Sequence, residues 1–332
     1  MMPHSAQTST SDLLLQSFQR DFPLVREPFA EIGNRIGVSE REVRAVCEVL
    51  VGSGVVARIG GVVRPNTIAA STLAAVGIPG LATDSVAEKI SKLNGVNHVY
   101  LRENAINIWF VATGPDRAFV DKTLQAVERL SGQPVLDLRL EHSFHIDLGF
   151  PLKGNAMAHR LRADPVIEYC PEPWDRDLVQ VLTSGLPLSP RPFQRIANDI
   201  GRSEDEVIGR IDHLLKSGIV TRLGLIIRHR ALGWSSNAMV VWDVEPEKIE
   251  DKARILATHR GINLCYRRRR YKDHWPYNLY CMIHAKSRES ALQTLEQASR
   301  SAGLDGYPRQ VLFSSRCYKQ TGALIVAPKE AA

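Results

Sequence analysis

The feature that most constrains the fold of this chain is an internal repeat. The segment PFAEIGNRIGVSEREV, which begins at Pro28, matches PFQRIANDIGRSEDEV, which begins at Pro192. Two further matches follow in the same order, SGVVARIGGVVR with SGIVTRLGLIIR and GVNHVYLR with GINLCYRR. The sequence therefore predicts a polar tail at residues 1–10, a first copy at residues 11–150, a connector at residues 151–173 and a second copy at residues 174–328.

Each copy opens with the pattern of a helix-turn-helix, which we expect over residues 11–70 and 174–235. Ser11 is a candidate cap for the first helix. Ser39 begins a capping box with the glutamate three residues later, and the second copy repeats this box at Ser203. Apolar residues follow each box at helical spacing, as in a helix that packs one face against a core.

The remainder of each copy alternates strand and helix patterns. Val55 to Val63 and Ile219 to Ile227 are expected to form β-hairpin wings. Residues 71–150 and 236–328 then follow the order β-α-β-β-α-β, which is the ferredoxin-like split unit. The predicted fold is therefore α+β: two tandem copies of a winged helix-turn-helix plus a ferredoxin-like domain, paired as an internal pseudo-dimer.

Composition limits the cellular setting and the kind of partner. We find no apolar run of the roughly 18 residues that a membrane-spanning helix needs, and the N-terminus does not resemble a secretory signal. The five cysteines are widely spaced, which predicts a cytoplasmic protein without a disulfide framework. A net charge of +6 indicates an anionic partner, either nucleic acid or a small molecule with many carboxylates.

The stretch from Cys265 to His284, CYRRRRYKDHWPYNLYCMIH, combines arginines with aromatic residues. Arginine binds carboxylates in two-point geometry, and aromatic rings stack on flat ligands. The candidate binding residues here are Tyr266, Arg267, Arg268, Arg270, Tyr277 and Asn278. Two other interpretations stay open, a solvated hairpin and a surface for single-stranded RNA.

The matching stretch of the first copy carries a histidine that the second copy lacks. His98 stands opposite Leu264 in the repeat, whereas Tyr100 and Arg102 match Tyr266 and Arg268. Because side chains alternate along a strand, His98, Tyr100 and Arg102 are expected to share one face of the sheet. A structural role for the lone histidine is the alternative.

Further basic residues recur between the copies on the expected wings. The candidate ligand-binding residues of this group, with a histidine after the last strand of the first copy, are Arg58, Arg64, His145, Arg222, Arg228 and His229. The alternative for the wing residues is that they are solvated surface charges. His142 and His145 have a spacing that metal sites use, but no carboxylate or cysteine set accompanies them, so we expect no metal held by the protein alone.

The helix-turn-helix pattern raises the possibility of DNA binding, as in transcription regulators of the Lrp/AsnC type. A recognition helix must bring cations near phosphates. Here its first turns carry the carboxylates of Glu40, Glu42, Glu204, Asp205 and Glu206, which a duplex would repel. We therefore expect these helices to serve packing and dimerisation, and no nucleic-acid partner.

Four stretches together resemble the siroheme decarboxylases. They are NHVYLRE, HIDLGF, RLGLIIRHRALGWSSNAMVVWDV and CYRRRRYKDHWPYNLYCMIH, and the resemblance extends over residues 11–326. It is to the fused NirDL type, in which two related halves form one chain. It implies removal of carbon dioxide from the C12 and C18 acetates of siroheme to give 12,18-didecarboxysiroheme, on the route to haem d1 or haem. It also implies no cofactor beyond the iron of the siroheme substrate.

The resemblance suggests roles for the candidate residues. Arg102 or Arg268 would anchor a reacting acetate, and His98 with Tyr100 would supply protons. His98, His145 or His229 could instead ligate the siroheme iron. We expect siroheme as the partner and no membrane; a homodimer and contacts with other tetrapyrrole-pathway proteins stay open. The competing functions are a ligand-responsive Lrp/AsnC-type transcription regulator and a non-catalytic tetrapyrrole carrier.

Overall fold

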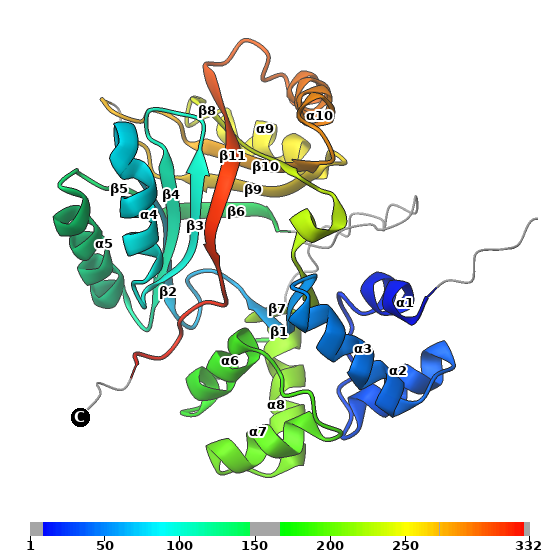
Figure 1. Cartoon of the computed structure of the whole chain (residues 1–332). Coiled ribbons are helices and arrows are strands. Elements are labelled where there is room, and N and C mark those ends of the chain that lie inside the picture. Colours follow the sequence, from blue (N-terminus) through cyan, green and yellow to red (C-terminus); the bar gives the residue numbers. More distant parts are fainter. Residues whose placement is uncertain (1–8, 147–166, 272, 329–332) are drawn as a thin grey trace, which may run out of the picture. The chain divides into compact units, whose positions relative to one another are not determined.

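The computed structural model describes residues 9–146, 167–271 and 273–328 (Figure 1). These residues divide into two compact units, and each unit is assembled from both copies of the repeat. One unit contains residues 9–64 and 167–232, and the other contains the remaining described residues. The chain is thus organised by kind of segment: helix-turn-helix pairs with helix-turn-helix, and ferredoxin-like segment with ferredoxin-like segment.

The helix-turn-helix unit repeats one order of elements. Its elements are α1 (Thr10–Ser17), α2 (Pro28–Ile36), α3 (Glu40–Gly52), β1 (Val56–Val63), α6 (Asp175–Ser184), α7 (Pro192–Ile200), α8 (Glu204–Lys216), β7 (Val220–Ile227) and the 3-10 helix η2 (His229–Leu232). In both copies a glycine in the left-handed conformation ends the second helix, Gly37 with φ 78° and Gly201 with φ 69°. A residue without a Cβ adopts this conformation at no steric cost, which makes the tight turn.

Two of the expected helix caps differ in detail. Ser9 caps α1 by accepting a hydrogen bond from the Asp12 backbone at 3.1 Å, so Ser11 lies inside the helix. The capping box is complete only in the second copy, where the Glu206 carboxylate accepts from the Ser203 backbone at 2.8 Å. In the first copy Glu42 instead accepts from the Thr10 hydroxyl of α1 at 2.8 Å, because that helix lies within its reach.

The expected hairpin wings are absent from the described residues, and this prediction is wrong. β1 and β7 pair with each other as an antiparallel two-stranded sheet, so each copy provides one strand. Gly60 lies opposite Gly224 at the centre of this ladder. A Cβ on Gly60 would come within 2.3 Å of the Leu182 carbonyl oxygen of α6, so the glycine lets the helix contact the ladder directly. Each copy thus completes its wing with a strand from the other.

The ferredoxin-like unit contains the larger sheet. Its elements are β2 (Ala70–Val76), the 3-10 helix η1 (Gly80–Ala82), α4 (Thr83–Ser91), β3 (Val96–Arg102), β4 (Ile108–Gly114), α5 (Arg117–Ser131), β5 (Leu136–Leu138), β6 (Leu140–Ile146), β8 (Ser236–Trp242), α9 (Ile249–Thr258), β9 (Ile262–Arg268), β10 (Leu279–Ala285), α10 (Arg288–Ser301) and β11 (Arg309–Gln320). The strand order across the described residues is β5-β2-β4-β3-β11-β8-β10-β9-β6. Apart from the wings, this is the predicted α+β arrangement.

The two copies exchange strands at both junctions of this sheet. The first half of β11 pairs with β8 of its own copy, and its second half pairs with β3 of the first copy. In the same way β5 pairs with β2, and the strand β6 that follows it pairs with β9 of the second copy. The exchange joins the copies through backbone hydrogen bonds, which is the internal pseudo-dimer expected from the repeat.

Three apolar cores hold this unit together. Helices α4 and α5 cover one face of the first copy's strands, and α9 and α10 cover one face of the second copy's strands (Figure 1). The third core joins the opposite faces of the two copies and includes Trp109, Leu138, Tyr280 and Leu312. The rings of Trp109 and Trp275, one from each copy, lie 5.2 Å apart between centroids. In each copy's half of the sheet, the face that bears no helices therefore looks into the junction between the copies.

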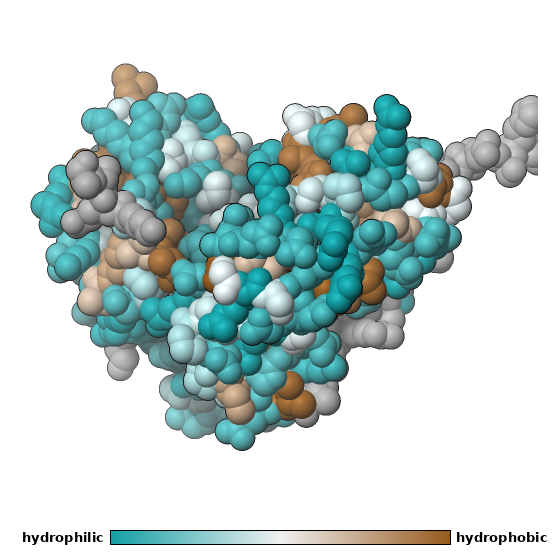
Figure 2. Space-filling view, turned by 90° about the horizontal axis from the view of Figure 1, so that it is seen from below, coloured by the Kyte–Doolittle hydropathy of each residue, from teal (hydrophilic) through white to brown (hydrophobic). Residues whose placement is uncertain are grey.

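The outer surface is mostly polar. In Figure 2 hydrophilic residues dominate the visible face, and apolar residues form only small separate groups. None of the helices in the described part of the chain has the length and apolar character needed to cross a membrane.

Candidate active site

The same aromatic and basic pair occupies equivalent strands of the two copies, β3 and β9, on the face that looks into the junction. On β3 the Arg102 guanidinium lies 5.6 Å from the centre of the Tyr100 ring. On β9 the Arg268 guanidinium lies 5.0 Å from the centre of the Tyr266 ring. Such cation–π contacts favour the cation when water is excluded. The Tyr-x-Arg motif that the sequence repeats is therefore a repeated structural unit as well.

His98 belongs to the same face as the first pair. Its ring lies 6.3 Å from the Tyr100 ring between centroids, with an angle of 16° between the planes. Histidine, tyrosine and arginine thus lie side by side along β3, as the alternation of side chains predicts. The second copy has Leu264 in place of the histidine. The histidine beside Tyr100 and Arg102 therefore has no counterpart at the matching position of the second copy.

The buried Arg102 guanidinium is held by groups of the second copy. Its Nη1 donates to the Leu312 backbone oxygen at 2.9 Å. Both Nη atoms approach the Asn237 side-chain oxygen at 3.3 Å. The charge of Arg102 is therefore fixed over Tyr100 by neutral acceptors from across the junction.

Arg268 also reaches across the junction but is held more loosely. Its Nη1 donates to the Leu138 backbone oxygen of the first copy at 3.0 Å. Its Nε has no hydrogen-bond partner, and within the described residues no carboxylate forms an ion pair with it. Burial lowers the pKa of Arg268, because desolvation disfavours the charged form. A cation in this position gains most from an anionic ligand.

The tyrosines around Arg268 remain neutral phenols at physiological pH. Burial raises the pKa of Tyr266 to about 12, although the charge of Arg268 opposes this. Burial also raises the pKa of Tyr280, whose hydroxyl accepts from the Trp275 indole at 2.8 Å. These rings therefore provide a flat, uncharged lining next to a cation.

The other candidates from the arginine-rich stretch have partners within the protein. Arg267 points away from Tyr266 and forms an ion pair with Glu141 at 2.7 Å. Arg270 bonds to the Asp243 carboxylate at 2.7 Å and to the Val244 backbone oxygen at 2.6 Å. The Arg270 contacts fix the loop between β9 and β10, and the Arg267 ion pair joins β9 to β6.

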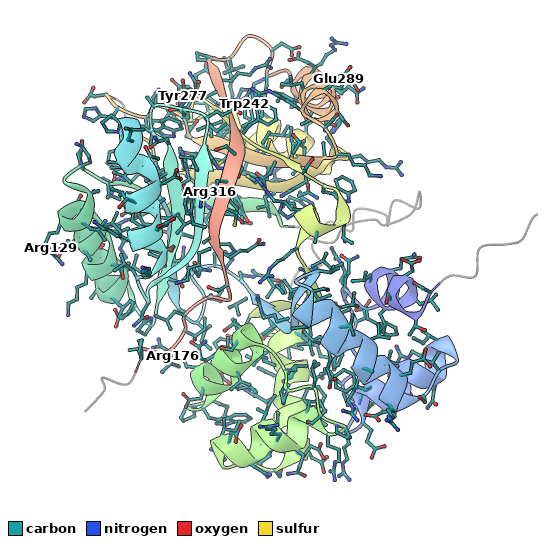
Figure 3. The ribbon with its side chains drawn as sticks, in the orientation of Figure 1. Arg129, Arg176, Trp242, Tyr277, Glu289 and Arg316 are labelled. Carbon is teal, nitrogen blue, oxygen red and sulfur yellow. The ribbon has the colours of Figure 1, made fainter. Side chains whose placement is uncertain are left out.

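Tyr277 and Asn278 lie at the end of the ferredoxin-like unit that also holds Trp242 (Figure 3). The Tyr277 ring packs edge-on against Trp275 at 4.9 Å between centroids. The Asn278 amide spans Val244, donating to its oxygen at 2.9 Å and accepting from its N–H at 3.0 Å. Asn107 of the first copy spans Ile78 in the same way, which explains why the repeat keeps an asparagine here.

His145 lies in the ferredoxin-like unit, on β6 opposite Cys265 of β9. Its side chain is buried, with 1% of the residue exposed. It stands on a strand that the first copy contributes to the second copy's half of the sheet.

The wing candidates belong to the helix-turn-helix unit. The backbone N–H groups of Arg64 and Arg228 close the two ends of the β1–β7 ladder, each with a 2.9 Å bond to the other copy. Arg222 pairs in register with Val62 on this ladder. Burial lowers the pKa of Arg58 to about 10. Burial and the charge of Arg230 lower the pKa of His229 to about 4, so His229 is neutral at physiological pH.

A buried polar chain behind Arg102 was not among the sequence predictions. It consists of Asn237 on β8, His284 on β10 and Asn263 on β9. Asn237 and His284 each lie in a mostly apolar strand, which is the signal that the sequence offers for them. Within the described residues, no group of three or more His, Cys, Asp or Glu side chains has the arrangement of a metal site.

Comparison with known proteins gives two matching family models. The siroheme decarboxylase NirDL-like HTH domain matches residues 12–56 and 175–220, and the AsnC-like ligand binding domain matches residues 68–145 and 231–319. The NirDL subunit of siroheme decarboxylase from Paracoccus pantotrophus is 47% identical over 313 residues, which are 94% of this chain and 96% of that protein.

Two solved structures also match over nearly the whole chain. A crystal structure of the siroheme decarboxylase NirDL is 25% identical with a TM-score of 0.67, and covers 95% of this chain and 94% of its own. A structure of the siroheme decarboxylase NirDL in complex with an iron-uroporphyrin III analogue is 25% identical with a TM-score of 0.66, and covers 94% of this chain and 93% of its own.

Proposed function

The chain belongs to the NirDL-type siroheme decarboxylases, and on that premise we propose that it removes carbon dioxide from the C12 and C18 acetates of siroheme. The product would be 12,18-didecarboxysiroheme, an intermediate towards haem d1 or haem. The observation that carries the proposal is the arrangement at the junction of the copies: His98, Tyr100 and Arg102 side by side, and Arg268 without an acidic partner among the described residues. A solved NirDL relative with a bound iron-uroporphyrin analogue supports a tetrapyrrole ligand.

The chemistry of siroheme fits these residues. It is a flat macrocycle with eight carboxylates, so its binding requires cations and planar apolar surfaces together. Tyr266 and Tyr100 provide rings beside guanidinium groups. Arg268 would bind one carboxylate and so gain the counter-ion that the described protein groups do not provide.

We assign the reacting acetate to Arg102 and the proton to His98. The bond between the acetate CH₂ and its carboxylate breaks, and the electron pair stays on the CH₂ beside the macrocycle, which delocalises it. His98, with Tyr100 adjacent, delivers a proton to that carbon, and a methyl group and carbon dioxide result. Arg102 keeps the acetate beside this donor. The iron belongs to the substrate, and no organic cofactor enters the proposal.

The remaining candidates keep the secondary roles that the sequence suggested. Arg58, Arg64, Arg222 and Arg228 are proposed as carboxylate-binding residues. Arg267, Arg270, Tyr277 and Asn278 are proposed to orient the other side chains of the substrate. His145 or His229 is proposed as an iron ligand, since a neutral imidazole is the form that binds iron.

A nucleic-acid partner is not proposed, because the first turn of α8 is already occupied by ion pairs. Arg26 bonds to the Asp205 carboxylate at 2.7 Å, and Arg191 bonds to Glu204. These arginines neutralise the acidic turn and so cannot also serve a phosphate backbone. We propose a cytoplasmic enzyme in which the helix-turn-helix unit serves packing. Further self-association or contact with other tetrapyrrole-pathway proteins is compatible with this.

The decisive experiment is anaerobic incubation of the full chain with siroheme, followed by mass spectrometry of the tetrapyrrole. Loss of two carbon dioxide units is expected. An unchanged tetrapyrrole that stays bound to the protein would instead indicate a carrier. A specific gel shift with genomic DNA fragments, without turnover, would indicate a regulator.

A further inference from the structure

The polar chain behind Arg102 runs through the buried face of the second copy. Asn237 Nδ2 lies 2.9 Å from His284 Nε2. His284 Nδ1 lies 3.0 Å from Asn263 Oδ1. The three residues are 3%, 6% and 8% exposed in the order Asn237, His284 and Asn263. Buried polar groups of this kind are costly unless each hydrogen bond is correctly matched, so the identity of each donor can be worked out.

Arg102 determines which atom donates and which accepts in each hydrogen bond of this polar chain. A guanidinium only donates, so the Asn237 atom that faces it must be the acceptor Oδ1. The Asn237 amide therefore points its NH₂ group at His284, whose Nε2 must accept. That leaves the proton of the neutral imidazole on Nδ1, where it donates to Asn263. If His284 carried a proton on Nε2, either alone or together with Nδ1, that N–H would face the Asn237 NH₂ group, which is also a donor.

The first copy lacks this chain at the equivalent positions. Ser71 stands where the second copy has Asn237, and its hydroxyl donates to Asn66 at 3.1 Å in a turn. Thr113 stands where the second copy has His284, and its hydroxyl oxygen accepts from the Leu324 backbone at 2.9 Å. This difference between the copies corresponds to a difference between the two arginines. Arg102 donates to an asparagine side chain, whereas Arg268 donates to a backbone oxygen.

We propose that Asn237 and His284 are positioning residues that hold Arg102 as a fixed carboxylate anchor, with His284 in the neutral form protonated on Nδ1. This rests on the role proposed above for Arg102. The second copy thereby orients the catalytic face of the first, and the two Tyr-x-Arg pairs are inequivalent: one rigid, one adjustable. Rigid placement beside His98 serves reaction geometry, because a small displacement of reacting groups lowers the rate strongly.

The first test reads the tautomer directly and does not depend on activity. The full chain is labelled with ¹⁵N-histidine, and the His284 signals are assigned by difference against His284→Gln. A protonated Nδ1 and an unprotonated Nε2 at neutral pH are expected. Protonation on Nε2, or on both nitrogens, would overturn the assigned direction of the chain.

The second test compares variants in steady-state decarboxylation of siroheme. Asn237→Ala should lower kcat/KM about 10-fold, as expected for losing a hydrogen bond to a charged group, while Ser71→Ala, the equivalent change in the first copy, leaves kcat/KM unchanged. His284→Ala should behave like Asn237→Ala, and His284→Gln, which can accept and donate in the same places, should restore most of the loss. Circular dichroism and thermal melting confirm folding.

The outcomes separate the inference from the proposed function. If the wild-type chain does not decarboxylate siroheme, the proposed function fails, whatever the tautomer. If the wild type is active and folded Asn237→Ala keeps its kcat/KM, the positioning role is wrong. If Asn237→Ala does not fold, Asn237→Asp decides: its carboxylate pairs with Arg102, and an undiminished affinity for siroheme contradicts the proposal.

Discussion

The two ferredoxin-like segments share a scaffold and differ in the few side chains that could carry chemistry. Both place an arginine over a tyrosine on equivalent strands, β3 and β9, and both direct that arginine to a backbone carbonyl oxygen of the other copy. Only the first copy adds His98, and only the second copy provides Asn237 to clamp the partner's arginine. Duplication has therefore kept the geometry but not all the side chains, with the histidine beside Tyr100 in one copy and the asparagine that holds Arg102 in the other.

The largest effect is expected at the residue that the copies do not share. His98→Ala should lower kcat about 1,000-fold, within the range for removing a general acid, and leave siroheme binding nearly unchanged. Leu264→Ala, at the matching position of the second copy, should leave kcat within a few-fold. Single-turnover mass spectrometry and absorbance titration measure the two properties. A His98→Ala variant with full turnover would remove the histidine from the mechanism.

The wing segments of the two copies should contribute differently to the pH dependence of the free energy of unfolding. The second copy carries His229, with its pKa lowered to about 4, where the first copy has Pro65. Between pH 6.5 and 4 the unfolded chain binds a proton that the folded chain does not, so stability falls as pH drops through this window. The loss should reach about 3 kcal/mol.

Urea unfolding of the full chain at several pH values measures this dependence. His229→Gln should flatten the slope between pH 6.5 and 4, whereas His142→Gln, an exposed histidine, should retain it. An equal slope in wild type and His229→Gln would mean that His229 is not the group responsible.

Removing Arg102 and Arg268 in turn should show that the two arginines are not equivalent. Arg268→Met should raise the KM for siroheme about 10-fold, because a charge-assisted hydrogen bond to a carboxylate is lost. The melting temperature without ligand should stay the same or rise, since a desolvated cation without an acidic partner among the described residues disappears. Arg102→Met should instead lower the melting temperature, because Asn237 is left without its donor. Identical behaviour of the two variants would contradict the inequivalence of the copies.

The sequence predicted the scaffold more completely than the site, and particular residues show why. The repeat and its strand alternation placed His98, Tyr100 and Arg102 on one face, because local periodicity determines which side chains share a face. The wings were predicted as hairpins because pattern alone cannot show that β1 would pair with β7, some 160 residues away. Asn237 and His284 were not predicted, since their role depends on an arginine that the other copy contributes.

The smallest expected effect tests whether Asn278 belongs to the site or to the scaffold. Asn278→Ala and Asn107→Ala each remove an amide that bridges the N–H and oxygen of one loop residue, in equivalent places of the two copies. Each should cost about 1 kcal/mol of stability, with Asn278 the more costly because it is the more buried. Thermal melting and KM measured on both variants separate the two roles. A scaffold role alone predicts similar small changes in both, whereas a rise in KM confined to Asn278→Ala would mean that this amide also contacts the substrate, as the arginine-rich stretch suggested.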